Sequence, residues 1–291
     1  MNQPAIPDTV SQQTPIADAV GSALHELPKA ASSPAVSAMS AVSAMSAVSA
    51  ASSALAFESI VLVLEAGGAL GAYQAGVFEG LVEEGLTPNW ISAVSIGALN
   101  AAIIAGNPPE RRVERLRGFW ERISRPAFLP STDGLEEWMV CMGQPMRKLF
   151  GTFDAWRSLL EGRNGLFVPR FPPVFGGFAP NPGVSLYDTK PMKSTLEEFA
   201  DFDLINAGTP RVSIGAVNAT SGEYTCFDNT RMRLTPEHFM ASGAQPPAFP
   251  AIEIDGEFYW DGGLGYFTPL ETVLAMQPRH DTLVFNVDLW N

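Results

Sequence analysis

The chain is poor in cysteine and histidine. It has two cysteines, Cys141 and Cys226, and three histidines, His25, His238 and His280, which lie far apart in the sequence. Two cysteines are too few for a disulfide framework and are typical of a protein in a reducing compartment. Because no cysteines and histidines stand at the spacing of metal ligands, we expect no metal site. The composition therefore favours a cytoplasmic protein without metal chemistry.

Positive charge is also in short supply. The 291 residues include 18 Lys and Arg against 31 Asp and Glu, so the formal net charge is -13. This charge argues against nucleic acid as a partner and against binding to acidic lipid by charge alone. Apolar residues, by contrast, make up 46% of the chain. That is enough for one large domain, or two small ones, with a sizeable core.

Residues 1–57 lack the mixture of side chains that a folded domain needs. No charged residue stands between Ala30 and Phe57, and serine recurs at every third position through much of this stretch. So much serine argues against a transmembrane helix, and the first basic residue, Lys29, comes too late for an ordinary secretory signal. We interpret residues 1–57 as a disordered low-complexity extension. A signal that begins late, with its apolar part at 35–57, stays open as the alternative.

Residues 58–291 have the pattern of one folded α/β domain. An apolar run at 60–64 predicts a buried strand, and apolar residues at helical spacing follow over 70–82. A second strand, at 90–94, leads directly into Ser95 and another apolar helix. We therefore expect two strand-to-helix turns side by side, where they can offer a nucleophile and a set of backbone N–H groups to one substrate.

The rest of the domain alternates between strands, helices and irregular segments. Its pattern predicts helices at 110–125, 191–202 and 235–240, hairpins within 211–228 and 253–260, and a last strand at 283–287. The first of these helices carries six arginines, which favours a solvated helix face over a helix on a membrane surface. Residues 126–186 are rich in Pro, Gly and aromatics without a clear period, so we interpret them as lid or packing segments.

The first strand ends in a glycine loop at 66–71, Ala-Gly-Gly-Ala-Leu-Gly. A phosphate-binding loop would need Lys and then Ser or Thr after the last glycine, and the chain has Ala and Tyr there. A dinucleotide fingerprint would need a glycine at position 66 and an acidic residue after the next strand, and both are missing. The backbone N–H groups of Gly67, Gly68 and Ala69, at a helix start, suit a developing negative charge. The loop is therefore a candidate oxyanion hole.

Ser95 is the candidate nucleophile. It lies between a strand and a helix, with the small residues Ala93 and Gly97 two positions before and after it. A nucleophile elbow needs such small neighbours to close its sharp turn. The string Val-Ser-Ile-Gly-Ala recurs around Ser213, but there it continues into a hairpin. Ser213 is therefore expected to be an ordinary strand residue.

Two groups compete as the base that activates Ser95. Asp261 opens an Asp-Gly-Gly turn with Gly262 and Gly263 after a strand, and a partly desolvated carboxylate there can act as the base of a Ser–Asp dyad. The alternative is an α/β-hydrolase triad, in which the order Ser95, Asp261, His280 would also be satisfied. Against the triad, only one βα unit precedes the serine, and His280 is expected in an exposed loop. The dyad is the simpler interpretation.

These motifs together resemble the patatin-like phospholipase family over residues 58–291. The family signature is Gly-Gly-Gly-x-x-Gly, then Gly-x-Ser-x-Gly, then Asp-Gly-Gly or Asp-Gly-Ala, and the chain carries all three in this order at 66–71, 93–97 and 261–263. The stretch 241–250, ahead of the aspartate, is also similar to that family. Bacterial members often carry a further C-terminal region, which we expect this chain to lack.

The resemblance implies a three-layer α/β/α fold with a central, mostly parallel sheet. It implies that fatty-acyl esters of phospholipids or neutral lipids are hydrolysed by a Ser–Asp dyad through an acyl-enzyme intermediate, without a cofactor. The expected partner is the lipid substrate, with peripheral membrane contact left open. Neither the resemblance nor the sequence predicts an oligomeric state.

The chain departs from the family pattern at four positions. Ala66 and Ala93 replace glycines, Leu70 stands where many members have Lys or Arg, and Phe267 stands where Asn is common. A badly placed oxyanion donor raises a reaction barrier by roughly 2.7–4 kcal/mol. The substitutions at 66, 93 and 267 motivate a second hypothesis, a catalytically weak or inactive homologue that binds a lipid or a partner.

Overall fold

The computed structural model describes residues 57–124, 162–170 and 185–289. The extension expected at 1–57, apart from its last residue, and most of the lid or packing segment expected at 126–186 lie outside the described residues. Both remain predictions.

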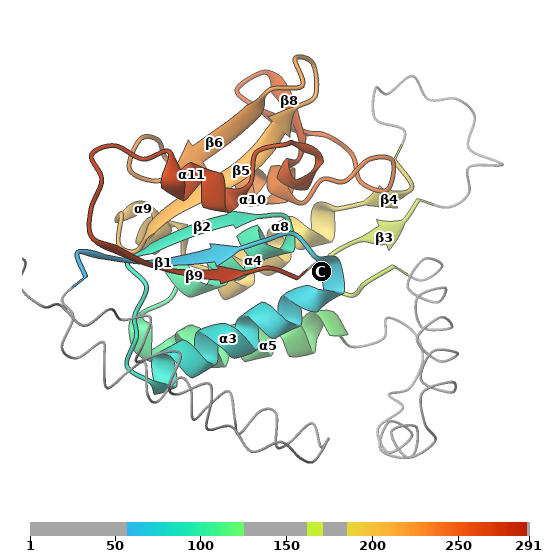
Figure 1. The fold of residues 1–291 in the computed structure, drawn as a ribbon. Coiled ribbons are helices and arrows are strands. Elements are labelled where there is room, and N and C mark those ends of the chain that lie inside the picture. Colours follow the sequence, from blue (N-terminus) through green and yellow to red (C-terminus); the bar gives the residue numbers. More distant parts are fainter. Residues whose placement is uncertain (1–56, 125–161, 171–184, 290–291) are drawn as a thin grey trace, which may run out of the picture. The chain divides into compact units, whose positions relative to one another are not determined.

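A seven-stranded sheet is at the centre of the described part of the chain (Figure 1). Its parallel part consists of β1 (Ser59–Leu64), β2 (Trp90–Val94), β5 (Arg211–Asn218) and β9 (Thr282–Val287). These strands lie in the order β9-β1-β2-β5. Most residues of β1, β2 and β5 are buried. A parallel strand covered on both faces has no solvent side, which is why these segments are almost continuously apolar.

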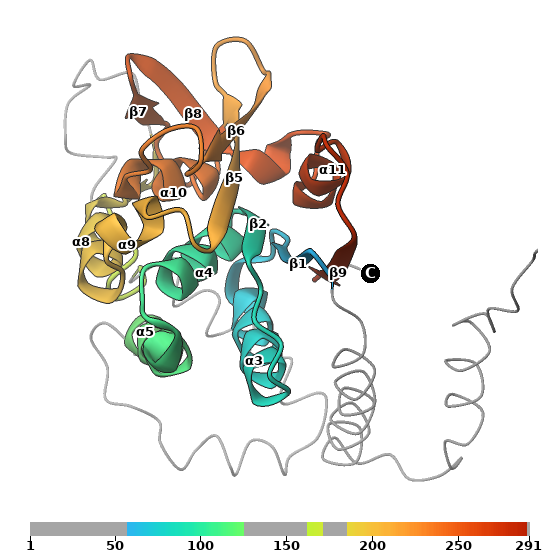
Figure 2. The ribbon, with the colours of Figure 1, turned by 90° about the vertical axis from the view of Figure 1, so that its left-hand side faces the viewer.

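Helices cover both faces of this sheet (Figures 1 and 2). On one face α4 (Ile96–Ala105) packs against β1, β2 and β5, and all 10 of its residues are buried. The helices that contact α4 are α3 (Gly71–Glu83), α5 (Arg112–Ser124), α8 (Lys190–Phe199), α9 (Phe202–Asn206) and α10 (Pro236–Ser242). On the other face α11 (Pro269–Leu274) packs against the same strands. The predicted three-layer α/β/α fold is confirmed.

Three further strands extend the sheet in antiparallel fashion: β6 (Tyr224–Asp228), β7 (Ile252–Ile254) and β8 (Glu257–Asp261). Short elements complete the described part of the chain: a ribbon of β3 (Val168–Pro169) and β4 (Tyr187–Asp188), and the 3-10 turns η1 (Gly68–Leu70), η2 (Pro109–Arg111) and η3 (Gly262–Leu264).

Strands β2 and β8 both pair with the same edge of β5. Residues 213–215 of β5 pair with β2 on one side and with β6 on the other. Residues 216–217 pair with β6 and with β8, so β8 lies on the edge that β2 uses. The two strands meet there end to end, because Val94 and Asp261 are opposite consecutive residues of β5. This junction brings together the segments that follow β2 and β8.

All predicted elements but one agree with the structure within two residues. The helix predicted at 191–202 ends at Phe199 and a separate helix, α9, follows. The cause is Asp201, whose extended backbone breaks the first helix and whose side chain accepts hydrogen bonds from the N–H groups of Asp203 and Leu204. The prediction also missed α11, although Thr268 and Glu271 form a capping box at its start.

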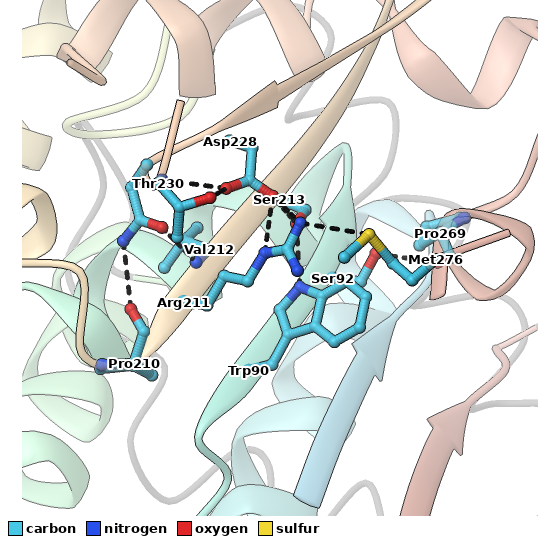
Figure 3. Close-up of polar contacts among 11 residues, drawn as sticks. Trp90, Ser92, Pro210, Arg211, Val212, Ser213, Asp228, Thr230, Pro269 and Met276 are labelled. Carbon is cyan, nitrogen blue, oxygen red and sulfur yellow. Dashed lines mark hydrogen bonds and ion pairs between the residues drawn. The ribbon is translucent and has the colours of Figure 1, made fainter. Parts of the chain in front are cut away.

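Ser213 lies inside β5, as predicted, and its side chain belongs to a buried polar network (Figure 3). Its hydroxyl accepts a hydrogen bond from Trp90 Nε1 at 2.8 Å and donates one to Asp228 Oδ2 at 2.7 Å. The same carboxylate oxygen pairs with Arg211 Nη2 at 2.6 Å, and the guanidinium lies 4.3 Å from the centre of the Trp90 ring. The hydroxyl and the charge are therefore both satisfied within the core.

This network controls the charge of Asp228. Burial alone would raise the pKa of Asp228, but hydrogen bonds from Arg211, Thr230 and Ser213 outweigh burial and hold the pKa below its ordinary value of 3.8. The unfolded chain takes up this proton at a higher pH than the folded protein does. The contribution of the ion pair to stability is therefore present above pH 3.8 and is lost as the pH falls through the folded pKa.

We predict that Asp228→Asn lowers the melting temperature at pH 7, because Arg211 loses its charged partner. Breaking a buried ion pair costs roughly 3–5 kcal/mol, and the stacking of Arg211 on Trp90 places the cost near the lower end. The difference from wild type should shrink as thermal unfolding is repeated at pH values below 3.8. The exposed pair of Asp203 and Arg233 is the control, since Asp203→Asn should change stability little. Equal losses in both variants would contradict the prediction.

Candidate active site

The glycine loop connects β1 to α3 at the carboxyl end of the parallel strands. Gly68 has φ +55, a left-handed conformation that favours glycine. A side chain at Gly67 would collide with the side chain of Leu289, which follows β9. The loop therefore favours glycine at Gly68 by conformation, a side chain at Gly67 would displace that of Leu289, and Ala69 lies within η1. Helix starts have N–H groups without an intrahelical acceptor, which is the feature an oxyanion hole uses.

Ser95 forms a strained elbow between β2 and α4. Its backbone has φ 56 and ψ -126, which a residue with a side chain rarely adopts and which costs of order 1–3 kcal/mol. Gly97 lets α4 approach β1, because a Cβ atom at this position would collide with the carbonyl oxygen of Leu64. Ala93 is fully buried within β2. Ser95 itself is only half-buried, although its neighbours in the turn are buried, so it is accessible to a substrate.

The structure brings Asp261 to this elbow. Ser95 Oγ donates a hydrogen bond to Asp261 Oδ2 at 2.7 Å, and the Gly263 N–H donates one to Asp261 Oδ1 at 2.7 Å. Gly262 has no room for a side chain, since a Cβ atom there would collide with Val94 and with the carbonyl of Gly215. The Asp-Gly-Gly turn is therefore required by close packing at the junction of β2 and β8, and it aims one carboxylate oxygen at the serine.

The carboxyl group of Asp261 has lost most of its solvent. It is 5% exposed, and burial raises its pKa from 3.8 to about 6, although hydrogen bonds from Ser95 and Gly263 lower it. In the described part of the chain no charged side chain contributes to this shift. Asp261 thus differs from Asp228, whose hydrogen bond to a serine has the same length but whose charge is compensated by Arg211.

The structure does not bring His280 to Ser95. His280 is exposed, precedes β9 and lies with its Nδ1 atom 2.7 Å from Glu58 Oε2, just before β1. Both residues are at the amino ends of their strands, whereas Ser95 follows the carboxyl end of β2. The two ends of β1 are roughly 16 Å apart at about 3.3 Å per residue. The arrangement of the α/β-hydrolase triad is therefore absent from these residues.

Two polar residues at the site were missed by the sequence analysis. Ser242, at the end of α10, accepts a hydrogen bond from the Ser95 N–H at 2.9 Å. Glu65 lies between β1 and the glycine loop, and burial, with Asp288 and Glu271 nearby, raises its pKa to about 7. The family-like stretch 241–250 was a signal for Ser242. An acidic residue directly after an apolar strand was the signal for Glu65.

The substitutions at 66, 93 and 267 fit their surroundings. The Ala66 methyl group faces Gly263, where a Cβ atom would be only 3.2 Å away, so the missing side chain of one residue leaves room for the other. Ala93 is enclosed in the sheet without exposure. The ring of Phe267 packs against the ring of Tyr224, with 5.2 Å between their centres. None of these substitutions separates Ser95 from Asp261.

Large apolar side chains are exposed on the two segments beside the site. Leu70 is 50% exposed in the glycine loop, and Leu264 and Tyr266 are 46% and fully exposed after Asp261. A Cβ atom at Gly263 would lie 3.2 Å from the Cβ atom of Ala66, so these two segments adjoin. We refer to these three exposed residues, Leu70, Leu264 and Tyr266, as the apolar rim of the candidate site.

Among residues 57–124, 162–170 and 185–289, no group of three or more His, Cys, Asp and Glu residues could hold a metal ion. In these same ranges, no helix combines the length and the apolar character that crossing a bilayer requires.

Comparisons with known proteins identify the family of this site. The family model described as patatin-like phospholipase matches residues 62–274, which include the glycine loop, the serine elbow and the Asp-Gly-Gly turn. Among solved structures, the chain is similar to the crystal structure of VipD from Legionella pneumophila, with a TM-score of 0.38 and 18% identity. That match covers 71% of this chain and 46% of the VipD chain, so this chain spans less than half of that protein.

The search of curated proteins gave no significant match. The family model covers well over half of the 291 residues, and the fold has the layers and the mostly parallel sheet expected of that family. The chain belongs to the patatin-like phospholipase family.

Proposed function

We propose that the protein is a serine acyl hydrolase that cleaves fatty-acyl ester bonds of phospholipids or neutral lipids. The observation that carries the proposal is the hydrogen bond of 2.7 Å between Ser95 Oγ, on a strained elbow, and the desolvated carboxylate of Asp261. Membership of the family supports a lipid ester as the substrate. The apolar rim beside the dyad is suited to acyl chains.

In the proposed reaction Asp261 takes the hydroxyl proton as Ser95 Oγ attacks the carbonyl carbon of the ester. The carbonyl oxygen becomes an oxyanion, which the backbone N–H groups of Gly67, Gly68 and Ala69 stabilise. The C–O bond of the ester then breaks, and the leaving alcohol takes the proton from Asp261. This yields acyl-Ser95. Water then attacks the acyl carbon and passes a proton to Asp261. The bond from the acyl carbon to Ser95 Oγ breaks, Oγ takes this proton from Asp261, and the fatty acid leaves.

Burial suits Asp261 for the role of the base. A base works best when its pKa lies near the operating pH, and burial raises the pKa of Asp261 to about 6. Gly263 binds the other carboxylate oxygen, so Oδ2 stays directed at the serine. No histidine is needed in this scheme.

The catalytically weak homologue is the less favoured hypothesis. Its motive was the presence of Ala66, Ala93 and Phe267 in place of the residues common in the family, and each of these side chains fits its surroundings without displacing the dyad. We therefore expect measurable turnover in the wild-type protein.

The first test uses the two copies of the serine string. Ser95→Ala should abolish hydrolysis of a p-nitrophenyl ester and labelling by a fluorophosphonate probe, since the proposed acyl-enzyme forms on the Ser95 hydroxyl. Ser213→Ala should retain both, although loss of its buried hydrogen bonds lowers the melting temperature. A label that maps to Ser213, or a wild type without turnover, would refute the proposal.

The second test separates a dyad from a triad. Asp261→Asn removes the base while keeping its shape and should reduce kcat/KM by roughly 10²–10⁴-fold. His280→Ala should change kcat/KM little, because the imidazole is exposed and pairs with Glu58. If both variants were equally inactive in folded protein, the histidine would be the base and the dyad would be wrong.

Dependence on pH tests the same base. The activity should fall as the pH drops through about 6, because protonated Asp261 accepts no proton from Ser95. An imidazole would give a similar limb, near its pKa of about 6.5. The two differ in enthalpy of ionisation, so the limb of a carboxylate should stay at the same pH when the temperature is changed, and that of an imidazole should move. Glu65→Gln, which removes the neighbouring carboxyl with a pKa of about 7, serves as the control for a second titrating group.

A further prediction concerns peripheral contact with lipid aggregates. Tyr266→Ser should lower the rate on phosphatidylcholine vesicles roughly tenfold, the effect of about 1.4 kcal/mol of lost apolar burial, and should leave a soluble short-chain ester unaffected. Leu204→Ser on α9, another exposed apolar residue, is the matched control and should behave as wild type. Equal losses on both substrates would place Tyr266 in catalysis, and no loss on either would exclude the rim as the route for lipid.

A further inference from the structure

We propose that Ser242 is a positioning residue that holds the elbow of the nucleophile, an inference that rests on the proposed function of Ser95. Ser242 Oγ accepts a hydrogen bond from the Ser95 N–H at 2.9 Å and donates one to the carbonyl oxygen of Gly215 at 2.7 Å. Its hydroxyl thus connects the residue after β2 to β5. Ser242 is fully buried, with 0% exposure.

The position of this hydroxyl follows from the strand pairing. Val94 is the last residue of β2 and lies opposite Gly215, and at Ser95 the chain turns away from the sheet into α4. The hydroxyl of Ser242 bridges the next N–H group and the Gly215 carbonyl, two polar groups at the end of the ladder. A buried N–H group without a partner would be costly, so the strained elbow depends on this bridge.

The helix that carries Ser242 is itself fixed. α10 packs against β5, β8 and α4, and its first turn is closed by a capping box between Thr235 and His238. Two residues after Ser242, the carbonyl oxygen of Ala244 accepts a hydrogen bond from the Asp261 N–H at 3.0 Å. The segment 242–244 therefore binds the backbone of both members of the dyad and sets their relative position.

Ser242 should influence the rate without taking part in proton transfer. Catalytic groups must be held within about 0.5 Å of their productive geometry by the residues behind them. Loss of the Ser242 hydroxyl frees the Ser95 N–H and lets the elbow relax, which misaligns Ser95 Oγ with Asp261. The hydroxyl makes no hydrogen bond to the Asp261 carboxylate, whose partners are Ser95 Oγ and the Gly263 N–H. The pKa of Asp261 should therefore be preserved.

The experiment compares Ser242→Ala with Ser92→Ala in the full chain. Ser92 is a matched control, since it is 1% exposed on β2 and its hydroxyl donates to a backbone carbonyl, that of Pro269, at 2.8 Å. Both variants lose a buried hydroxyl, but only Ser242→Ala leaves the Ser95 N–H without its partner. Melting temperature, kcat and KM on a p-nitrophenyl ester, and amide hydrogen exchange of Ser95 are measured for each.

We expect Ser242→Ala to lower kcat by roughly 10- to 100-fold with KM and the acid limb of the pH profile unchanged. The Ser95 amide should exchange faster in Ser242→Ala, and Ser92→Ala should match wild type in kcat and in this exchange. Equal kcat values in the two variants, or an unchanged Ser95 exchange rate, would overturn the inference. Should Ser242→Ala not fold, Ser242→Cys takes its place, because a thiol keeps the shape but accepts a hydrogen bond poorly.

The outcomes for Ser242 and for the proposed function are distinguishable. A wild type without ester turnover contradicts the proposed function, whereas an active wild type with an equally active Ser242→Ala contradicts only the positioning role. The exchange measurement does not require turnover, so it tests the hydrogen bond in either case.

Discussion

The candidate site depends on one constraint of the sheet, the meeting of β2 and β8 on the same edge of β5. A strand edge can pair with only one strand at a time, so β2 must end where β8 ends. The residues at this junction, Val94 and Asp261, are held opposite consecutive residues of β5 by the ladders on either side. Ser95 follows directly. A serine and a carboxylate that are 166 positions apart in sequence are thus brought together by strand pairing rather than by a flexible loop.

The two serine–aspartate pairs of this fold show that geometry alone does not define a reactive site. Ser95–Asp261 and Ser213–Asp228 each have an oxygen–oxygen distance of 2.7 Å. Arg211 compensates the charge of Asp228 and Trp90 donates to the hydroxyl of Ser213, so that pair is a stable part of the core. Among the described residues no cation compensates the charge of Asp261, and burial raises its pKa, as the proposed role of a base requires.

Much of this arrangement could be predicted from sequence because it is local. Apolar runs located the strands, and glycine stops and turn residues located the helix ends and the hairpins. The residues after each serine string distinguished Ser95, at the start of a helix, from Ser213, inside a strand. What could not be predicted depends on tertiary contacts. Ser242 contacts Ser95 across 147 positions, and the pKa values of Glu65 and Asp261 arise from burial that no local pattern encodes. The break between α8 and α9 follows from the cap that Asp201 forms, and the start of α11 carried a local signal, the capping box of Thr268 and Glu271, that the prediction overlooked.

The site combines several features that are unfavourable on their own. Ser95 has a strained backbone, Asp261 is buried with no compensating cation in the described ranges, and Gly262 and Gly263 contribute no side-chain packing. Such features persist only where the surrounding structure determines them. Here α4 is buried over its full length, the parallel strands are apolar on both faces, and α10 fixes the backbone of both dyad residues. The buried packing around the site therefore offsets the strain at the elbow.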